Sequence, residues 1–433
     1  MNITGKTALE IAESVRQLLQ SRQLLAGQVL PPVRELALAL EVNRNTVAAA
    51  YKRLTAAGLT LTQGRLGTSI RHQPEAGEQE GMLAGSPLID LACGNPNQTW
   101  LPDPAALLAS ATYRPRLYGE ATVTPALEQH ARQWLAGDCP AACDIDVTHG
   151  AVDAIERLLA AHLVAGDKVA VEHPCFLSSI NTLRLGGLQA LGVAMDQHGM
   201  LPQALEQALQ QGARAVLITP RAHNPTGCSL SQARAAALQQ ILARHPHVLA
   251  IVDDHFAMLA LAPYYSVLPA ATRHWAVIRS VSKVFGPDLR LACVASDSET
   301  ARRLRLRLAP GTTWVSHLLQ EAVAACFASR EIQGQVALAK ADYAQRSAWL
   351  AEALREQGIG TPADSDGLNL WLPLRQDSQS LVLMMANKGW LVRSGAAFSV
   401  QEPVQGLRIS IATMTRELAW RFAADLKPGI EGR

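Results

Sequence analysis

The sequence predicts two folded parts, a small helical head that ends in a β-hairpin and a larger α/β body. Two short helical patterns and an alternating hairpin pattern fall within residues 1–71. Residues 72–86 are rich in Gly, Glu and Gln, and from residue 87 short β-branched runs alternate with Ala/Leu-rich helical stretches. Because 433 residues exceed one small core, we expect domains at 1–71 and 87–427, joined by a linker at 72–86.

The bulk composition is that of a globular protein. Hydrophobic residues make up 48% and charged residues 18%. No apolar run approaches the roughly 18 residues that span a bilayer, and no signal peptide is visible, so a cytoplasmic protein is expected. The seven cysteines are scattered and odd in number, which argues against a disulfide framework. Cys139 and Cys143 lack a second Cys or His pair, so no metal site is expected.

Charge is distributed unevenly along the chain. Residues 1–72 hold nine Lys/Arg and four acids, a net charge of +5. The remainder holds 30 bases and 33 acids, a net charge of −3. A basic head on a mildly acidic body indicates a nucleic-acid contact confined to the head.

The head has the order helix, turn, helix, hairpin. Val33–Leu40 has helical spacing, and Asn43 is a good N-cap for a second helix that reaches about Ala57 and ends at Gly58. On that second helix Val47, Ala50, Tyr51 and Leu54 share one face, and Arg44, Asn45, Ala48 and Lys52 share another. An apolar face to anchor the helix and a cationic, amide-bearing face to reach bases and phosphates are what a recognition helix needs.

The hairpin follows directly. Leu59–Gln63 and Thr68–Ile70 alternate around Gly64-Arg65-Leu66-Gly67, a glycine-bounded tip that can enter a minor groove. An ordinary helical cap with a solvated basic face is the alternative for such a head.

The head resembles the winged helix-turn-helix of the GntR regulator family. The matching residues are Leu30-Pro31-x-x-Arg34-x-Leu36-Ala37, Val42-x-Arg44-x-Thr46-Val47, Ala50-Tyr51-x-x-Leu54, Gly58 and Gly64-x-x-Gly67-Thr68. The resemblance implies that the head binds double-stranded DNA, and the expected DNA-binding residues are Arg34, Arg44, Asn45, Thr46, Lys52, Arg65 and Gly67. The sequence departs from the family at Pro32, usually a small hydroxyl residue, and at Glu41, usually Gly.

The body reads as a mostly parallel sheet followed by a smaller α+β lobe. Buried strands are predicted at Lys168–Val171, Ala215–Thr219, Val248–Val252, Ala276–Arg279 and Leu291–Ala295, with helices at Gln203–Gln210 and Ser231–Ala243. After residue 330 a long helix and strands at Leu368–Leu372, Trp390–Arg393 and Leu407–Ile411 are predicted. The ending Ile430-Glu431-Gly432-Arg433 spells a processing-protease site, so residues 428–433 are expected to be an added tail.

Lys283 is the first candidate functional residue of the body. It follows a predicted strand in Ser280-Val281-Ser282-Lys283, and Arg290 comes seven residues later. A lysine amine forms a Schiff base with the aldehyde of pyridoxal phosphate, and Ser280, Ser282 and Arg290 can bind its phosphate. A surface lysine is the default for such a motif taken alone.

Other strand ends carry suitable partners. Asp253 ends a strand and suits a pyridine nitrogen, Asn224 could hydrogen-bond a phenolic oxygen, and His149-Gly150-Ala151 leads into a helix whose amides suit a phosphate. Phe176 could stack on the ring, and Arg408 could clamp a carboxylate. Taken singly, Asp253 could be a surface acid, Phe176 a core residue and Arg408 an ordinary ion-pair arginine.

Together these residues resemble the aspartate-aminotransferase fold of pyridoxal-phosphate enzymes, known as fold type I, over about residues 88–427. The resemblance implies that Lys283 forms the Schiff base, Asp253 pairs with the pyridine nitrogen and Asn224 donates to the phenolate. It implies phosphate ligands at Arg290, Ser280, Ser282, Gly150 and Ala151, ring stacking by Phe176, and a substrate carboxylate on Arg408. Tyr118 is similar to the tyrosine that reaches the neighbour's phosphate, which implies a homodimer.

Two departures from the aminotransferases stand out. His255 occupies a position where the family commonly has Tyr, so the phenolate environment is altered. The glycine that usually follows Tyr118 within a few residues is missing from Glu120–Thr124. Both changes are more easily tolerated by a sensor than by a fast enzyme.

A GntR-type head joined to an aminotransferase-like body resembles the MocR subfamily of bacterial regulators, and most closely its PtsJ-type members. The resemblance implies a regulator that senses pyridoxal phosphate or an amino compound and controls vitamin B6 salvage. A working aminotransferase with a DNA-binding appendage is the alternative, and a DNA binder with a cofactor-free dimerisation platform is a third. The run Arg302–Arg307 is expected to be a solvated helix face rather than a second DNA contact.

Overall fold

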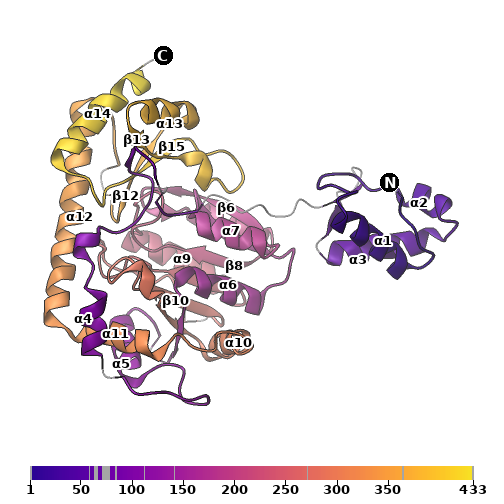
Figure 1. Cartoon of the computed structure of the whole chain (residues 1–433), viewed down its shortest axis with the longest axis horizontal. Coiled ribbons are helices and arrows are strands. Elements are labelled where there is room, and N and C mark those ends of the chain that lie inside the picture. Colours follow the sequence, from indigo (N-terminus) through magenta and orange to yellow (C-terminus); the bar gives the residue numbers. More distant parts are fainter. Residues whose placement is uncertain are drawn as a thin grey trace. The chain divides into compact units, whose positions relative to one another are not determined.

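The computed structural model describes residues 2–57, 59–62, 67–70, 79–82, 85–111, 113–140, 142–270, 272–362 and 365–431, without the side chains of Ala56, Thr62, Pro104 and Ser110. The chain forms two compact units, Met1–Gly77 and Glu78–Arg433, which we call the head and the body (Figure 1). Each is described by itself. Among the described residues, no helix is both long and apolar enough to cross a membrane.

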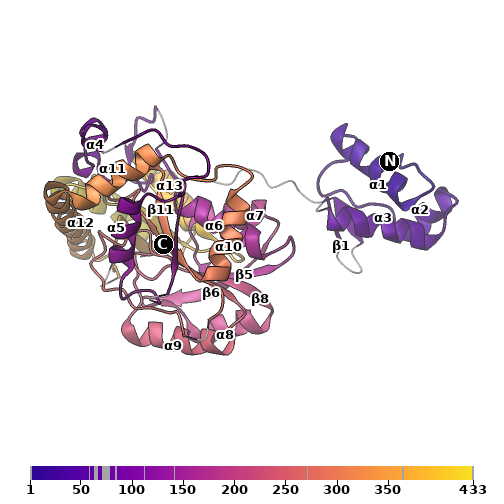
Figure 2. The same ribbon diagram turned by 90° about the horizontal axis from the view of Figure 1, so that it is seen from below.

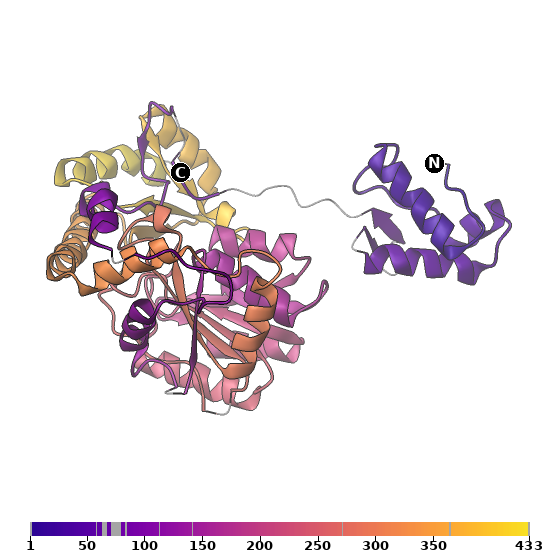
Figure 3. The ribbon, with the colours of Figure 1, turned by 60° about the horizontal axis from the view of Figure 1, so that its bottom comes forward.

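Three helices and a two-stranded hairpin make up the described part of the head (Figure 3). They are α1 (Ala8–Gln20), α2 (Val33–Ala39), α3 (Arg44–Ala56), β1 (Thr60–Thr62) and β2 (Thr68–Ile70). The two predicted helices and the antiparallel hairpin are confirmed, and Asn43 caps α3 by accepting from the Asn45 amide at 2.8 Å. The predicted terminator Gly58 and the hairpin tip at 63–66 lie outside the described residues.

Helix α1, which was not among the predicted elements, supplies much of the core of the head. Thr7 and Glu10 form a capping box at its start, and Ile11 and Val15 are fully buried. They join the inward face predicted for α3, where Val47, Ala50, Tyr51 and Leu54 are all buried. A Thr-x-x-Glu pair before an apolar period was the available signal for α1.

Glu41, which departs from the GntR pattern, has a backbone conformation that is typical of glycine. It lies between α2 and α3 with φ +54°, in the left-handed region that glycine adopts without strain. The turn therefore keeps the conformation that a glycine would favour, at a strain cost that this chain accepts.

An eight-stranded sheet organises the large lobe of the body. Its strands lie in the order β4 (Asp144–Thr148), β11 (Ala292–Ser296), β10 (Trp275–Ser280), β9 (Leu249–Asp253), β8 (Ala213–Ile218), β5 (Lys168–His173), β6 (Gln189–Asp196) and β7 (Gly199–Met200). The pairs from β10 through β9, β8 and β5 to β6 are parallel, whereas β11 runs antiparallel to both neighbours. The five predicted strands of this sheet are present, with ends shifted by one or two residues.

Helices cover both faces of this sheet, which explains why its central strands are largely apolar. Alternate residues such as Val169, Val171 and Ile251 pack with α6 (Ala151–His162), α7 (Leu177–Leu185) and α10 (Ser298–Leu308). The intervening residues, such as Ala170 and Val252, pack with α5 (Pro125–Leu135), α8 (Pro202–Gln210) and α9 (Gln232–Arg244). Figure 2 shows α8 and α9 on the side of the sheet away from α6 and α10.

The small lobe is built on the long helix α12 (Arg330–Glu356) and a three-stranded sheet (Figure 1). Its strands are β12 (Asn369–Pro373), β15 (Gly406–Ser410) and β14 (Arg393–Ser394), with α13 (Ser378–Asn387) and α14 (Arg416–Glu431) packed beside them. The remaining described elements are β3 (Ile89–Asp90), η2 (Gln98–Trp100), α4 (Pro104–Ser110), η3 (Pro287–Leu289), α11 (His317–Ala328), β13 (Trp390–Leu391) and η4 (Gly395–Phe398).

The predicted strand Trp390–Arg393 is wrong as a single element. Its first half is β13, which pairs in parallel with β3 from the start of the body, and its second half is β14, which pairs with β15. The split follows from tertiary pairing with two partners, which a short apolar run does not reveal. At the C-terminal end, α14 continues into the expected tail, where Ile430 packs against the core.

Candidate functional site

Helix α3 of the head carries the exposed polar face that the sequence predicted. Arg44, Asn45 and Lys52 are exposed and Thr46 is half-buried. Arg34, on α2, is also exposed. Gly67 has φ +84° beside β2, whereas Arg65 lies outside the described residues.

A cavity of about 280 Å³ lies in the body at the carboxyl ends of several strands. Its lining contains nine of the residues that the sequence singled out: Lys283, Asp253, Asn224, His255, Phe176, Ala151, Ser280, Ser282 and Arg290. Strand ends from distant parts of the sequence are therefore brought together as predicted.

Lys283 follows β10 and points its amine into this cavity. The Nζ atom donates to the carbonyl of Gly94 at 2.7 Å. Burial lowers the pKa of this amine, and Arg408 lowers it further, against the opposing charge of Glu80. A lysine amine with a lowered pKa is easier to deprotonate, and a neutral amine is the form that attacks a carbonyl.

Asp253 is the last residue of β9, and its carboxyl group is buried. Burial raises its pKa to about 7, and the neighbouring Asp254 and Glu172 add to the effect. No described residue bonds to its buried Oδ1 atom. A cationic N–H group in the cavity would satisfy that oxygen.

A cradle suited to a phosphate lies at the start of α6. Gly150 has φ +98° and is the N-cap, and no described side chain caps the first amides of the helix. A Cβ at Gly150 would lie 3.1 Å from Arg290 Nη2, which donates to the His149 carbonyl at 2.9 Å. Ser280 and Ser282 are linked through their hydroxyls at 3.1 Å. Amides, hydroxyls and a guanidinium thus line one end of the cavity.

His255 lies near Asp253, with 3.9 Å between Nδ1 and Oδ1. Burial lowers its pKa to about 4, and Lys283 adds to the effect, so the imidazole is neutral at physiological pH. Within the described structure its buried Nδ1 has no hydrogen-bond partner.

Arg408, on β15, is fully buried and already engaged. It binds Glu80 with both terminal nitrogens, the Nη2–Oε2 distance being 2.8 Å, and donates to Asn224 Oδ1 at 3.0 Å. Its guanidinium lies 5.1 Å from the centroid of the Phe398 ring. Glu80 was not predicted as a site residue, because it falls within the predicted linker.

Glu172 and His223 form a second buried pair that the sequence analysis missed. Glu172 lines the cavity, accepts from the Thr219 amide at 2.9 Å and lies 3.3 Å from His223 Nε2. Both residues lie beside predicted motif residues, at the end of β5 and next to Asn224, but nothing in their spacing indicated that they would meet.

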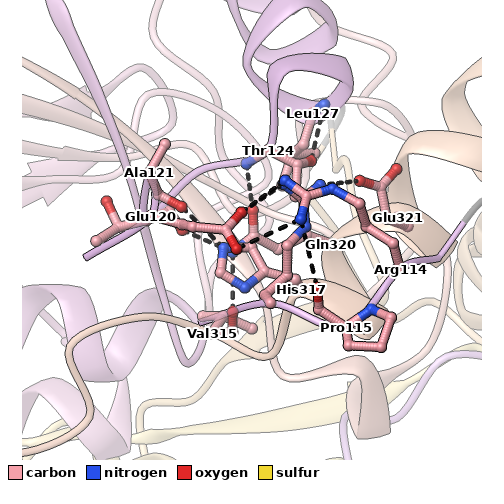
Figure 4. Close-up of polar contacts among 12 residues, drawn as sticks. Arg114, Pro115, Glu120, Ala121, Thr124, Leu127, Val315, His317, Gln320 and Glu321 are labelled. Atoms are coloured by element: carbon pink, nitrogen blue, oxygen red, sulfur yellow. Dashed lines mark hydrogen bonds and ion pairs between the residues drawn. The ribbon is translucent and has the colours of Figure 1, made fainter. Parts of the chain in front are cut away.

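Tyr118 lies outside this cavity, on a loop that is hydrogen-bonded to helix α11. Its side chain is 92% exposed and contacts Trp314 edge-on at 5.5 Å. The buried amide of Gln320, on α11, bonds to the loop at the Thr122 carbonyl and the Thr124 amide, each at 2.8 Å (Figure 4). Glu120 begins the segment from which the expected glycine is missing, and its side chain accepts a hydrogen bond from the Leu117 amide at 2.9 Å. The loop therefore presents Tyr118 outward while its following residues are hydrogen-bonded to α11.

Two other surfaces are less suited to the predicted chemistry. A wider groove of about 640 Å³ between α4, α5, α11 and the start of α12 is lined by a mixture of alanines and polar residues and contains none of the predicted site residues. On α10, Arg302 and Arg303 bind Glu299, and Arg305 binds Asp144 and Asp146. The described residues contain no cluster of metal ligands.

Two family models match this chain, one over the head and one over the body. Residues 7–70 match the gntR family of bacterial regulatory proteins, and residues 86–426 match aminotransferase class I and II. The vitamin B6 salvage pathway transcriptional repressor PtsJ of Salmonella typhimurium is 54% identical over 98% of both chains. The HTH-type regulator TauR of Rhodobacter capsulatus is 24% identical over 91% of this chain and 90% of its own.

Solved aminotransferases share the fold of the body. A kynurenine aminotransferase from Pyrococcus horikoshii superposes with a TM-score of 0.71 at 20% identity, covering 80% of this chain and 92% of its own. The α-aminoadipate aminotransferase LysN from Thermus thermophilus gives 0.70 at 20% identity, over 80% and 92%.

Pyridoxal phosphate is the cofactor of this fold family, and the cavity fits it. The unpartnered oxygen of buried Asp253 suits a protonated pyridine nitrogen, and the uncapped start of α6 suits a phosphate. The chain therefore belongs to the GntR family of bacterial transcription regulators, in the MocR-type branch whose body is a pyridoxal-phosphate aminotransferase fold.

Proposed function

We propose that this regulator binds its operator through α3 and the hairpin and carries pyridoxal phosphate on Lys283 as its sensor of vitamin B6 status. The observation that carries the proposal is that one cavity contains both a buried lysine with a lowered pKa and a buried aspartate whose Oδ1 atom bonds to no described residue. The name of the similar PtsJ repressor supports a role in vitamin B6 salvage.

Each predicted site residue of the body has a role in this proposal. Pyridoxal phosphate supplies an aldehyde that bonds to amines and a ring that draws electrons toward its protonated nitrogen. Asp253 would hold that proton, and Asn224 and His255 would face the phenolic oxygen. Phe176 would stack on the ring, while Ser280, Ser282, Arg290 and the amides at Gly150 and Ala151 would bind the phosphate. Arg408 would take the carboxylate of an amino-compound effector.

In the head, the proposed contacts divide by position. Arg44 and Asn45 begin α3, and the first residues of a recognition helix are those that reach base edges. Arg34, Thr46 and Gly67 would lie against the DNA, as the GntR resemblance implies, Lys52 would reach bases or phosphates from the polar face of α3, and Arg65 would enter the minor groove at the hairpin tip.

The exposed Tyr118 supports a homodimer. An aromatic side chain that is 92% exposed on a loop held by Gln320 suits a contact with a second copy of this chain. The mass of the protein in solution would test the dimer. A DNA-binding regulator of this kind would work in the cytoplasm, where its operator lies.

The experiment that tests the proposal is binding of the full chain to its own upstream DNA, with and without pyridoxal phosphate, at fixed salt. An affinity that changes with the cofactor is the expected result, because a ligand that favours one arrangement shifts DNA binding. Specific binding that ignores the cofactor would contradict a cofactor sensor.

A working aminotransferase is the second candidate, because Lys283, Asp253 and Arg408 are all present at one site. Repeated transfer of amino groups to a 2-oxo acid would support an enzyme. A single slow half-reaction would support the sensor.

A further inference from the structure

The carboxylate of Glu80 occupies the position where the proposed function places an effector carboxylate. Both of its oxygens bind the terminal nitrogens of Arg408. Asn224 Nδ2 also donates to Glu80 Oε1 at 3.3 Å. A two-pronged guanidinium–carboxylate contact of this kind is how arginine recognises the carboxylate of a small molecule.

The surroundings accommodate Glu80 closely. A Cβ at Gly94 would lie 2.9 Å from Glu80 Oε2 and 3.4 Å from Arg408 Nη2, so this position must lack a side chain for the contact to form. Arg408 has no exposed surface, and a buried cation needs an anionic partner. In this structure the chain itself supplies that anion.

Glu80 is charged at neutral pH. Burial would raise its pKa, but hydrogen bonding to Arg408 and the positive charges of Arg408, Arg393 and Lys283 outweigh burial, and the pKa is lowered. Glu80 therefore has the same ionic chemistry as the carboxylate of an amino acid.

The residues on either side of Glu80 are also bound to the body. The Gln79 carbonyl accepts from Arg393 Nη2 at 3.0 Å, and the Gly81 amide donates to the Cys93 carbonyl at 3.2 Å. Residues 71–78 join this segment to Ile70, the end of β2 in the head. When residues 79–81 are bound to the body, the segment that connects the head to the body is therefore shorter than when they are released.

We propose that Glu80 is an internal ligand of the effector site, and that an amino acid displaces it from Arg408 with its own carboxylate and so releases residues 79–81 from the body. The inference rests on the proposed function, because it takes the cavity as the cofactor site. Since both carboxylates use the same two nitrogens of Arg408, they exclude one another. Effector binding and linker release are then coupled, and each favours the other.

Two stable probes separate the carboxylate from the rest of the ligand. N-(5′-phosphopyridoxyl)-L-alanine carries a carboxylate, and N-(5′-phosphopyridoxyl)ethylamine lacks it. Their Kd values would be measured by calorimetry on the wild-type chain, on Glu80→Gln and on the control Glu75→Gln, which removes the same charge from the linker sequence. All three proteins would be prepared free of cofactor.

Glu80→Gln should tighten binding of the carboxylate probe and leave the ethylamine probe unchanged. If Glu80 holds Arg408 for about nine-tenths of the time, removal of the competitor gains about tenfold in Kd. Glu75→Gln should behave as wild type. An equal preference for the carboxylate probe in wild type and Glu80→Gln would overturn the inference while leaving the cofactor site intact. If neither probe binds any of the three proteins, the proposed cofactor site fails and the inference fails with it.

Hydrogen exchange on the wild-type chain gives a readout that needs no variant. The carboxylate probe should speed exchange at the Gly81 amide, because release of Glu80 breaks the bond to the Cys93 carbonyl. The ethylamine probe should leave this amide protected. Equal protection of Gly81 with both probes would contradict displacement.

Discussion

The head and the body place their charged functional groups in opposite environments. In the head, Arg44 and Lys52 project from a helix whose other face fills a small apolar core. In the body, Lys283, Asp253 and Arg408 are buried. Arg408 is paired with Glu80, whereas the Oδ1 atom of Asp253 bonds to no described residue. An enclosed charge without a partner is costly and so marks a ligand site. An exposed charge costs little, so in the head only the order of elements and the residue pattern identified the function.

The strongest test of the enclosed site is removal of its amine. Lys283→Ala should abolish the visible absorption band of lysine-bound pyridoxal phosphate completely, because no amine would remain at that position to bond the aldehyde. Absorption spectra after incubation with the cofactor would measure it, with unchanged far-ultraviolet circular dichroism as the check on folding. A retained band would place the attachment elsewhere.

The cost of burying Asp253 should appear as a pH dependence of stability in the cofactor-free protein. Its folded pKa of about 7 lies above the ordinary aspartate pKa of 3.8, so between these pH values the folded state holds a proton that the unfolded state has lost. The contribution of Asp253 to stability should therefore fall as pH rises toward 7, by about 1.4 kcal/mol per pH unit, and level off above it.

Asp253→Asn removes this slope and should exceed wild type by up to about 4 kcal/mol at pH 8, with the difference shrinking toward pH 5. Urea unfolding at several pH values measures this, and Glu402→Gln, at an exposed acid, is the control. A difference that does not vary with pH would mean that the Asp253 carboxyl is not held neutral by its surroundings.

The exposed charges of the head should matter for DNA binding. Arg44→Ala should weaken operator binding by about 1–3 kcal/mol if Arg44 reads a base. Fluorescence anisotropy at fixed salt would measure it. Arg302→Ala is a matched control, since this arginine is also exposed but is paired with Glu299 on the body. Equal effects of the two variants would remove Arg44 from the recognition role.

A smaller effect is expected in the turn between α2 and α3. Glu41→Gly should stabilise the head by about 0.5–1 kcal/mol, because glycine adopts positive φ without strain. The ion pair lost to Lys6, 3.6 Å long and well exposed, is worth little. Slower hydrogen exchange of the α3 amides in the full chain would show the gain. Unchanged or faster exchange would mean that the left-handed turn carries no strain.

The sequence predicted those parts of the site that lie at strand ends. Asp253 and Lys283 follow apolar runs that could be recognised as strands, and parallel strands bring their ends to one edge. Nine residues named in advance line a single cavity for this reason. The helix after His149 was predicted in the same way.

Glu80 could not be predicted in this way. Its surroundings in the sequence are polar and resemble a solvated linker, and its partner Arg408 lies on a strand of the small lobe, far along the chain. Only the folded chain brings them together. The split of Trp390–Arg393 was missed for the same reason, since both of its pairing partners are remote in sequence.

The end of β9 limits how the length of this chain can change. Asp253 faces the cavity, while Asp254 is held by Arg221 at 2.7 Å and Arg279 at 2.8 Å. Successive residues of a strand point to opposite sides, so a one-residue shift here would move one carboxylate into the place of the other. A deletion before Asp253 would bring Asp254 to the cavity and leave His255 facing the two arginines, which would lose their anion. An insertion would bring Asp253 to the arginines and leave Val252 at the cavity, which would lose its acid. Over this strand, evolution can replace amino acids one at a time, but it has little freedom to add or remove them.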